Sequence, residues 1–471
     1  MEAVFSQPVL HSCRVGHRRH CPVRLEGHRP VNIGMFPMSG IRVCDAELLR
    51  LGLTLPGFVE RSKTIASLPS LGLLTLAGMT PARHSVRYVE VPDVNLMASL
   101  PGGLDVAVIS TYSAQVGEAY ALAQRFRAAG VPTVIGGPHV TALPDEAAEH
   151  CDAVVVGEGE PVWLRVLEDA ERGRLLPRYR AGADEFDLAD APMPAFELLD
   201  ISKYNRLTVQ TSRGCPHHCE FCASSVVLTH RYKQKPVGKV LAEIARIQAM
   251  WDRPFIEFAD DNSFVNHAYW KELLRPLKGK GLRWFAETDV SVADDGELLD
   301  LMRETGCAQV LIGLESPTDA GLRGLELRND WKFKNFPRYK EAIRAIQSRG
   351  ITVNGCFVIG LDGHTAGIFD QVFTFVRESE LYEVQVTLMT PFPGTPLYAR
   401  LERENRLLEP RNWNKCTLFD INFKPANMSG QELHDGFKKL AVELYSDEFT
   451  KWRRSRFKHA MRDQRKGGSR T

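Results

Sequence analysis

The feature of this sequence that most limits its fold is a double alternation of short β-branched runs with helical patterns. Such alternation is typical of β-α-β units, in which a parallel sheet is covered by helices. It runs over residues 32–177 and again over residues 206–396, and the stretch between them, 178–205, contains Pro192 and Pro194 and has no clear period. We therefore expect an α/β protein with two such domains joined by a linker.

The first alternation predicts a Rossmann-like domain. Strands are expected at 105–110, 132–135 and 152–156, and helices at 116–129 and 160–172. Small or polar residues follow each strand, and in open sheets of this kind ligands bind at the carboxyl ends of the strands. The candidate ligand-binding residues at these junctions are Ser110, Thr111, Tyr112, Ser113, Gly136, Gly137, His139, Gly157 and Glu158.

The second alternation predicts about six β-α units, and hence a barrel or part of one. Its expected strands are 207–211, 255–259, 284–288, 309–313, 352–359 and 383–389. Residues 397–471 are expected to form a smaller, mostly helical cap that includes a helix over 430–445. Residues 1–31, rich in Arg and His, are expected to be an unstructured leader.

Composition and charge exclude several classes of protein. With 44% hydrophobic and 25% charged residues the chain is not disordered, and no apolar run approaches the roughly 18 residues of an integral membrane segment. The 59 basic and 58 acidic residues leave a net charge of +1, so the electrostatic footprint of a nucleic-acid-binding protein is absent. Residues 451–471 alone carry +8. We expect this basic tail to be solvated and partly frayed, with contact to phosphate or an anionic lipid head group as the alternative.

The cysteine content indicates where the protein works. Ten cysteines among 471 residues lie far below the density of a disulfide scaffold. The N-terminus also lacks the charged start and apolar core of a signal peptide. We therefore expect a cytoplasmic protein with reduced thiols.

Three cysteines, Cys215, Cys219 and Cys222, have C-x3-C-x2-C spacing directly after the first strand of the second alternation. This spacing places three thiolates on one tight loop, close enough to bind one metal centre. A closed structural site wants four protein ligands, so three thiolates would leave one iron of a [4Fe-4S] cluster open. The alternatives are a zinc site completed by His217 or His218, and a redox pair formed by the second and third cysteines.

This triplet, in this place, resembles that of the radical S-adenosylmethionine (SAM) enzymes, in which the open iron binds the amino and carboxylate groups of SAM. The first domain, through residues 69–77, 136–141 and 157–160, resembles the cobalamin-binding domain of one large branch of that superfamily. Residues 390–396 and the pair Asn412-Trp413 are similar to the C-terminal extension of a subgroup that includes hopanoid lipid methylases.

The resemblance implies which residues bind SAM. Phe221, just before the third cysteine, stands where the family places an aromatic ring near adenine. The remaining positions are Asp260, Asp261 and Asn262 for the amino group, Glu315 and Ser316 for the ribose, and Val358 with its strand neighbours for adenine. Taken without the family, the two aspartates would be read more readily as a helix cap.

Cobalamin contacts are expected from backbone and small side chains at the three junctions of the first domain. The cobalt-binding motif Asp-x-His-x-x-Gly is absent there, and its one match, Asp362 to Gly367, follows the fifth barrel strand and is interpreted as coincidence. His139 is expected either to bind the cofactor or to be a structural histidine. Glu158 and Glu160 have a helix cap as their alternative role.

The resemblance further implies an enzyme that uses a [4Fe-4S] cluster, SAM and cobalamin to methylate an unactivated carbon through a 5′-deoxyadenosyl radical. Its expected partners are a small-molecule or lipid-like substrate and a reducing protein such as flavodoxin or ferredoxin. The alternatives are ring contraction, cyclisation or oxidation without methyl transfer, and a non-catalytic iron-sulfur or cobalamin sensor. No catalytic acid, base or hydrogen donor can be assigned, because Cys307 and Cys356 are read more readily as core thiols.

Overall fold

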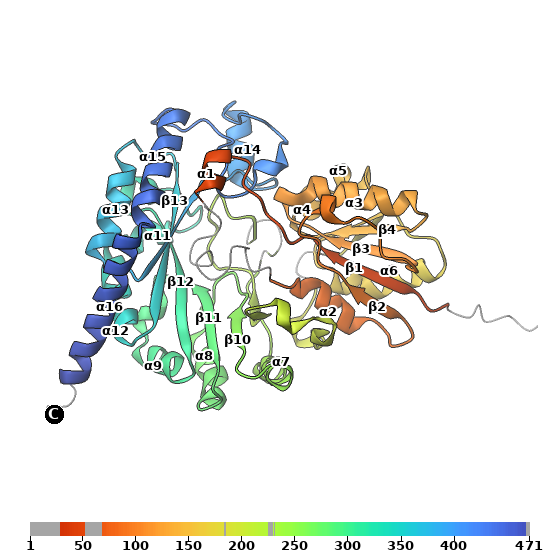
Figure 1. The fold of residues 1–471 in the computed structure, drawn as a ribbon, viewed down its shortest axis with the longest axis horizontal. Helices are drawn as coiled ribbons and strands as arrows, with labels where there is room; N and C mark the ends of the chain where they lie inside the picture. Colours follow the sequence, from red (N-terminus) through yellow and green to blue (C-terminus); the bar gives the residue numbers. More distant parts are fainter. Residues whose placement is uncertain (1–28, 52–67, 183–184, 225–228, 230, 468–471) are drawn as a thin grey trace, which may run out of the picture.

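In the computed structural model, residues 29–51, 68–182, 185–224, 229 and 231–467 are described. The predicted leader therefore lies almost wholly outside the described residues. The chain forms two parallel sheets, each covered by helices, with a helical C-terminal region packed beside the second sheet (Figure 1). The predicted α/β class is confirmed.

The first sheet has six parallel strands in the order β2-β1-β3-β4-β5-β6. These strands are β1 (Asn32–Pro37), β2 (Ser85–Tyr88), β3 (Val106–Ser110), β4 (Thr133–Gly136), β5 (Ala153–Val156) and β6 (Arg178–Arg180). The helices of this part are α1 (Ala46–Arg50), α2 (Leu71–Met79), α3 (Val116–Ala128), α4 (Pro138–Ala142), α5 (Pro144–Ala148) and α6 (Glu160–Glu171). Strand β6 extends the sheet into the first residues of the predicted linker.

Alternate residues of the central strands pack into two cores, one on each face of this sheet. In β3, Ala107 and Ile109 join the core beneath α3, whereas Val106 and Val108 join the core beneath α2 and α6. Because both faces are covered, the strand needs apolar residues at every position and reads as an unbroken hydrophobic run.

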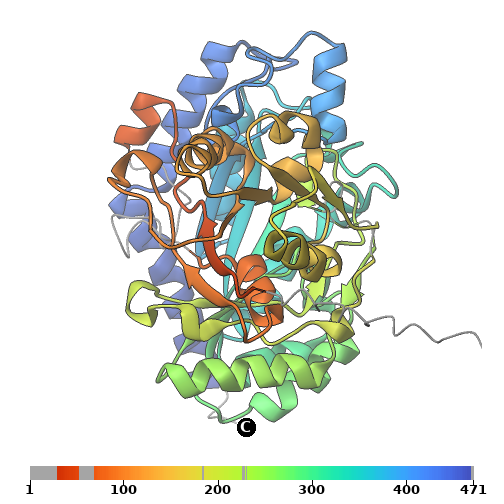
Figure 2. The ribbon, with the colours of Figure 1, turned by 90° about the vertical axis from the view of Figure 1, so that its right-hand side faces the viewer.

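The second sheet has the order β14-β13-β12-β11-β10-β7, so consecutive β-α units lie side by side as an open, partial barrel. Its strands are β7 (Leu207–Val209), β10 (Phe255–Phe258), β11 (Arg283–Thr288), β12 (Cys307–Glu315), β13 (Thr352–Ile359) and β14 (Glu383–Leu388). All six were predicted near these positions. A separate antiparallel pair, β8 (Ser212–Arg213) and β9 (Lys233–Gln234), follows β7. Figure 2 shows the first sheet in front of this partial barrel.

Helices cover the outer face of the partial barrel. They are α7 (Val237–Met250), α8 (His267–Leu274), α9 (Gly296–Glu304), α10 (Asp319–Leu322), α11 (Trp331–Asn335), α12 (Tyr339–Ser348) and α13 (Ile368–Glu378). Beneath α8, the ring of Phe258 lies 5.0 Å from that of Trp270 and 5.4 Å from that of Trp284, all three fully buried. Truncating one such ring to alanine typically costs about 3–5 kcal/mol, so this cluster anchors the helix layer.

The C-terminal region closes the edge of the barrel at β14. It contains α14 (Pro396–Arg403), α15 (Gly430–Leu444) and α16 (Asp447–Gly467). The outward backbone N–H of Val386 donates to the Tyr445 hydroxyl at 3.2 Å, and that of Leu388 donates to the carbonyl of Leu418 at 2.7 Å. The edge strand therefore pairs with side-chain and loop acceptors instead of another strand.

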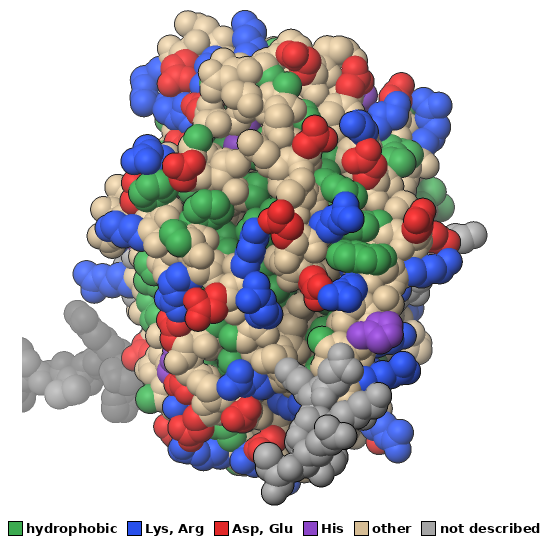
Figure 3. All heavy atoms as spheres, turned by 90° about the vertical axis from the view of Figure 1, so that its left-hand side faces the viewer, with side chains coloured by type: hydrophobic (Ala, Val, Ile, Leu, Met, Phe, Trp, Pro, Cys, Tyr) green, Lys and Arg blue, Asp and Glu red, His purple; other side chains and the backbone are tan. Residues whose placement is uncertain are grey.

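The prediction of a frayed basic tail is wrong for residues 451–467, which continue α16. Arg453 is fully buried; its guanidinium donates to the Tyr382 carbonyl at 2.8 Å and pairs with Glu383 at 3.2 Å. On the face of the molecule shown in Figure 3, acidic and basic side chains are interspersed. Among the described residues, no helix combines the length and the apolar character that a membrane crossing requires.

Candidate active site

The three cysteines lie on the loop after β7 and β8, at the carboxyl end of the barrel strands. All three thiols are free, and Cys219 is the most buried of them. Burial raises the pKa of Cys215 to about 11, and the neighbouring Cys222 adds to this rise. Burial also raises the pKa of Cys219, so these two thiols would lose their protons readily only when a metal centre compensates the negative charge.

Glu326 holds this cysteine loop in shape from the segment after α10. Its buried carboxylate accepts hydrogen bonds from the backbone N–H groups of His218 at 3.0 Å, Arg328 at 3.1 Å and Asn329 at 2.6 Å. Sequence reasoning missed Glu326, because no local motif marks a residue that acts on a loop 108 positions away.

The geometry of the loop disfavours the zinc alternative. His217 Nε2 lies 3.1 Å from Asp289 Oδ2, and its ring packs 4.4 Å from that of Trp331. In the described part of the chain, no three His, Cys, Asp or Glu side chains converge on a single metal ion. Three free thiols on one loop instead fit the wider [4Fe-4S] cluster, which needs no fourth protein ligand when another molecule binds the open iron.

Asp260, directly after β10, is a brace between strands. Its carboxylate accepts from the backbone N–H groups of Thr211 at 2.7 Å and Ser212 at 2.9 Å, and from the hydroxyl of Ser263 at 3.2 Å. Burial raises its pKa. Both carboxylate oxygens are used in these bonds, so the side chain predicted to hold the SAM amino group instead fixes the chain that enters the cysteine loop.

The next two residues reach the cysteine loop itself. Asp261 accepts from the backbone N–H of Gly214 at 2.7 Å, one residue before the first cysteine. The amide nitrogen of Asn262 donates to Asp289 at 2.8 Å, but its buried Oδ1 accepts no hydrogen bond within the described structure. An unpaired buried acceptor is costly, and the ammonium group of SAM would satisfy it.

Glu315 ends β12 in a left-handed backbone conformation, with φ at 63°. Lys332 of α11, buried beside it, lies 2.8 Å from the Glu315 carboxylate and donates to the carbonyl of Gly313 at 2.6 Å. A side chain on Gly313 would collide with Glu315, since an added Cβ would lie 2.5 Å from Oε1. The sequence offered no signal for Lys332, although this buried pair suits a polar ligand such as ribose or a carboxylate.

Ser316 and the remaining predicted SAM residues are held by the barrel. The Ser316 hydroxyl lies 3.0 Å from His364 Nε2, and His364 Nδ1 accepts from the N–H of Gly360 at 3.3 Å. Burial lowers the pKa of His364 to about 4, so this histidine of the Asp-x-His-x-x-Gly match is a neutral clamp between two strand ends. Val358 is buried in the barrel core, and Phe221 packs against that core.

At the carboxyl ends of β3 and β4, two of the predicted junctions lie against each other. Gly137 has φ at 117°, and a Cβ there would lie 2.5 Å from the carbonyl oxygen of Thr111, so only glycine permits this approach. Tyr112 remains 57% exposed although the protein surrounds it closely enough to raise the pKa of its phenol. Gln115, just beyond, is buried with both amide atoms unpaired in the described structure. An accessible ring beside an unsatisfied amide fits a large ligand with peripheral amides, as cobalamin has.

His139 is a structural histidine by its contacts. Its Nδ1 lies 3.1 Å from the Ser113 hydroxyl and its Nε2 lies 3.2 Å from Glu146. Burial lowers its pKa, which favours the neutral ring. Glu146 also accepts from Trp413 Nε1 at 2.9 Å and pairs with Arg411 at 2.7 Å, which ties the first domain to the C-terminal region.

The remaining junction residues line the same ends of the sheet. Ser110 ends β3 and Gly136 ends β4, where an added Cβ would make only ordinary contact with Val155 at 3.6 Å. Gly157 has φ at 84°, and its backbone N–H donates a hydrogen bond to the Thr141 hydroxyl at 3.1 Å. The carboxylate of Glu158 points to the barrel, where Lys233 lies 2.7 Å away.

Polar side chains on the inner face of the barrel form a group that the sequence analysis missed. Glu257 of β10 pairs with Arg206. Its register partner on β11 is Phe285, and Glu287 lies two residues beyond Phe285. Burial, with the negative charges of Glu257 and Asp261, raises the pKa of Glu287 to about 7. In the sequence, these two glutamates could have been recognised as acidic residues inside predicted strands that are otherwise largely apolar.

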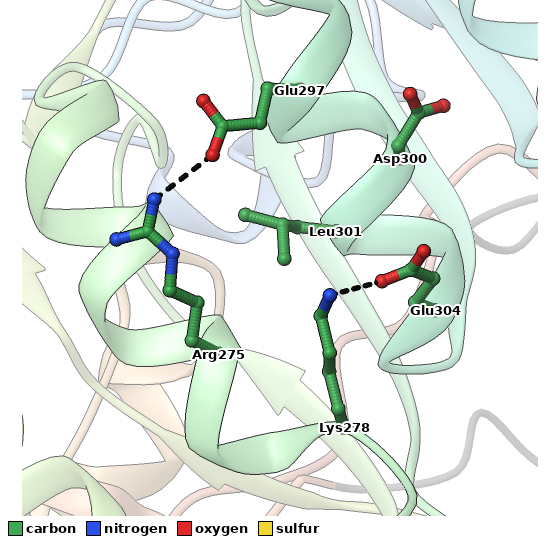
Figure 4. Close-up of a pocket in the computed structure, with 6 residues that line it drawn as sticks. All are labelled: Arg275, Lys278, Glu297, Asp300, Leu301 and Glu304. Atoms are coloured by element: carbon green, nitrogen blue, oxygen red, sulfur yellow. Dashed lines mark hydrogen bonds and ion pairs between the residues drawn. The ribbon is translucent and has the colours of Figure 1, made fainter.

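A shallow pocket elsewhere on the surface lies between α9 and the turn after α8 (Figure 4). Two ion pairs cross it, Arg275 with Glu297 at 2.9 Å and Lys278 with Glu304 at 2.5 Å. All four side chains are about half exposed or more. Because these charges satisfy one another on the outer helix layer, this pocket offers no group for chemistry.

Known families match this arrangement. Residues 209–376 match the radical SAM superfamily, residues 66–166 the B12 binding domain, and residues 395–471 a domain of unknown function. An uncharacterized methyltransferase of Synechocystis sp. is 31% identical over 80% of this chain and 71% of its own length. Hopanoid C-2 methylase of Rhodopseudomonas palustris is 28% identical over 74% of this chain and 67% of its own length.

The fold is also found in a solved structure. The radical SAM methyltransferase TsrM of Kitasatospora setae, with cobalamin and a [4Fe-4S] cluster bound, superposes with a TM-score of 0.64 at 14% identity, over 93% of this chain and all of the other. The chain belongs to the radical SAM superfamily. Within it, the chain is an enzyme of the branch that carries a B12-binding domain, and its cofactors are a [4Fe-4S] cluster, SAM and cobalamin.

Proposed function

We propose that this enzyme methylates an unactivated carbon of a small-molecule substrate, with lipid-like molecules among the candidates because one relative is a hopanoid methylase. The observation that carries the proposal is the contact between the two ligand-binding ends, where Arg213, two residues before Cys215, pairs with Glu158 of the B12-binding domain at 3.0 Å. When bound, the cluster supplies the electron that cleaves SAM, and cobalamin supplies the methyl group.

The proposed roles of the residues follow from their contacts. Cys215, Cys219 and Cys222 hold the cluster. The free Oδ1 of Asn262 accepts from the SAM ammonium group, and Lys332 neutralises Glu315 so that both can face the polar end of SAM. The remaining proposed contacts to SAM are made by Phe221, Asp261, Ser316 and Val358.

For cobalamin, we propose contacts from Tyr112 and from the backbone of the three junctions, without a histidine to cobalt. His139 then supports the site through Ser113. We assign residues 32–177 to the cobalamin domain, 178–205 to a linker, 206–396 to the radical SAM barrel and 397–471 to the cap. In this proposal the barrel shields the radical from water.

The proposal includes the surroundings in which the enzyme works. The eight cysteines among the described residues are free thiols. Thiolate ligands of an oxygen-sensitive cluster need a reducing compartment, so we place the enzyme in the cytoplasm. A flavodoxin or ferredoxin would deliver the electron.

The test is anaerobic turnover of the reconstituted enzyme with SAM labelled in its methyl group and Ti(III) citrate as reductant, together with the small-molecule extract of cells that lack the protein. We expect 5′-deoxyadenosine and a labelled product. A Cys222→Ala variant should give neither. An altered but unlabelled product would favour ring contraction, cyclisation or oxidation, and a failure of the intact enzyme to release 5′-deoxyadenosine would favour a sensor.

A further inference from the structure

Four charged side chains form a closed cluster between the two domains. Arg213 of β8 and Lys233 of β9 come from the barrel domain, and Glu158 and Glu160 come from the loop after β5 and the start of α6. Arg213 lies 3.0 Å from Glu158 and 2.5 Å from Glu160, and Lys233 lies 2.7 Å from Glu158. The exposed fractions of these side chains are only 16%, 15%, 8% and 6% for Arg213, Lys233, Glu158 and Glu160.

The members of the cluster are paired with one another and with nearby groups. Its two positive and two negative charges balance, and the backbone N–H of Phe186 donates to Glu158 at 3.1 Å while its carbonyl accepts from Lys233 at 2.9 Å. Burial alone would raise the pKa of Glu158, but Lys233, the Phe186 N–H and Arg213 together hold it below its ordinary range. The carboxylate therefore stays charged at neutral pH.

Buried ion pairs of this kind contribute little net stability, because the cost of removing the charges from water offsets their attraction. What they supply is direction, since the planar guanidinium of Arg213 can pair one nitrogen with Glu158 and another with Glu160 in only a few orientations. The cluster is thus better suited to fixing the relative position of two segments than to holding two domains together.

The two segments that it joins are those that hold the cofactors. Arg213 is followed by Gly214, whose N–H is fixed by Asp261, and then by the first cysteine. On the other side, Gly157 to Glu160 form the junction after β5, at the carboxyl ends of the first sheet. No side chain intervenes between the guanidinium and either carboxylate.

We propose that Arg213, by pairing with Glu158 and Glu160, is a positioning residue that sets the distance between the cobalamin site and the iron-sulfur site. The inference rests on the proposed use of both cofactors in one reaction. It gives the Gly-Glu-Gly-Glu segment a role that differs from the predicted contact to cobalamin, because its carboxylates act toward the barrel. A displacement of about 1 Å between reacting groups can cost about 100-fold in rate, so a change in the distance between the two cofactor sites should lower the reaction rate measurably.

The test uses the loaded holoenzyme and the distance between its two paramagnetic centres, the reduced cluster and Co(II) of cobalamin, measured by pulsed electron paramagnetic resonance. Arg213→Gln should broaden the distance distribution about twofold or more relative to wild type, while iron and cobalamin contents per chain stay unchanged. Arg213→Lys should restore part of the narrow distribution, because it keeps one charged pair. Release of 5′-deoxyadenosine, which needs only the cluster and SAM, should remain within about twofold of wild type.

Arg275→Gln is the matched control, since Arg275 pairs with Glu297 on the outer helix layer (Figure 4) and should leave the distribution unchanged. Glu160→Gln and Glu158→Gln remove the same ion pairs from the side of the other domain, and each should also broaden the distance distribution. They keep the inference testable if Arg213→Gln does not fold. Unchanged distance distributions in the variants of Arg213, Glu158 and Glu160 would overturn the inference. Loss of cobalamin from Glu158→Gln, with the paramagnetic resonance signal of the iron-sulfur cluster still narrow, would overturn it as well. If wild type itself binds no cobalamin or releases no 5′-deoxyadenosine, the proposed function fails instead.

Discussion

Glu287 is the residue whose acidity is most clearly set by the fold. Its strand neighbours Ala286 and Trp284 join the outer core, so strand alternation places Glu287 and Phe285 on the inner face of the barrel. The side chain is exposed to water, yet protein charges lie close enough to act on the carboxylate, among them that of Arg206, which lowers its pKa. Burial and the charges of Glu257 and Asp261 raise its pKa from 4.5 to about 7.

This rise predicts a pH-dependent stability. Because the folded protein binds this proton more tightly than the unfolded chain does, the contribution of Glu287 is complete below pH 4.5 and is lost as the pH rises through about 7. The Tm of Glu287→Gln minus that of wild type should therefore increase between about pH 5 and about pH 8 in thermal unfolding. A Tm difference that is constant over this range would contradict the raised pKa.

At the same scale, the local motifs of the site could be predicted and its remote supports could not. The cysteine spacing is a property of ten consecutive residues, 213–222, and the Asp260 to Asn262 motif of three. Lys332 and Glu326 contact the site only because the chain after β12 folds back onto the cysteine loop. A local sequence pattern does not predict such a contact. Even the Asp260 to Asn262 motif did not predict that the Asp260 carboxylate accepts hydrogen bonds from the backbone.

Among the elements, strands were easier to predict than the ends of the chain. A strand buried on both faces is apolar along most of its length, so β3 and β5 could be located from their unbroken hydrophobic runs. The strand β6, with only Tyr179 buried between two exposed arginines, lacks that signal and was placed in the linker. The helical order of α16 was missed, because the charge count does not distinguish the buried Arg453 from the exposed basic residues around it.

The element-scale prediction concerns this helix. Arg453→Met would remove the fully buried partner of Glu383 and leave the carboxylate paired with the partly exposed Arg454 at 3.6 Å. A buried charge left without any partner typically costs about 3–5 kcal/mol, so with Arg454 still present we expect a smaller loss. We expect faster hydrogen exchange throughout α16 and a lower unfolding free energy. Lys451→Met is the control, because Lys451 is 78% exposed and pairs with the exposed Asp447 in the preceding turn. Equal exchange rates in the two variants would show that Arg453 does not anchor the helix.

On the scale of the whole molecule, Glu146 joins parts of the chain that are far apart in sequence. It lies on α5 of the first domain, 267 residues before Trp413, and it receives hydrogen bonds from both Trp413 and Arg411. Tyr120 also donates to it, at 3.4 Å, and a further partner is His139, which contacts Ser113 at the strand ends. The C-terminal region thus contacts the cobalamin end of the first domain as well as the barrel.

Removing this junction should uncouple the domains. Glu146→Ala leaves the His139 ring and the Trp413 N–H without an acceptor, at a cost of about 1–3 kcal/mol for each buried group. In differential scanning calorimetry we expect the single transition to separate, with the first domain melting earlier than the barrel. Glu149→Ala, on the exposed side of the same segment, should keep one transition. A single transition lowered equally for all domains would indicate a local effect only.

The covered edge of the partial barrel has a consequence for self-association. All six residues of β14 are buried, and a hydrophobic strand with free backbone donors is a template on which a second chain can add a strand. Here Tyr445 and Leu418 already accept from the outward N–H groups of Val386 and Leu388. The C-terminal region thereby protects an incomplete barrel from edge-to-edge aggregation, a hazard that a closed barrel avoids by having no edge at all.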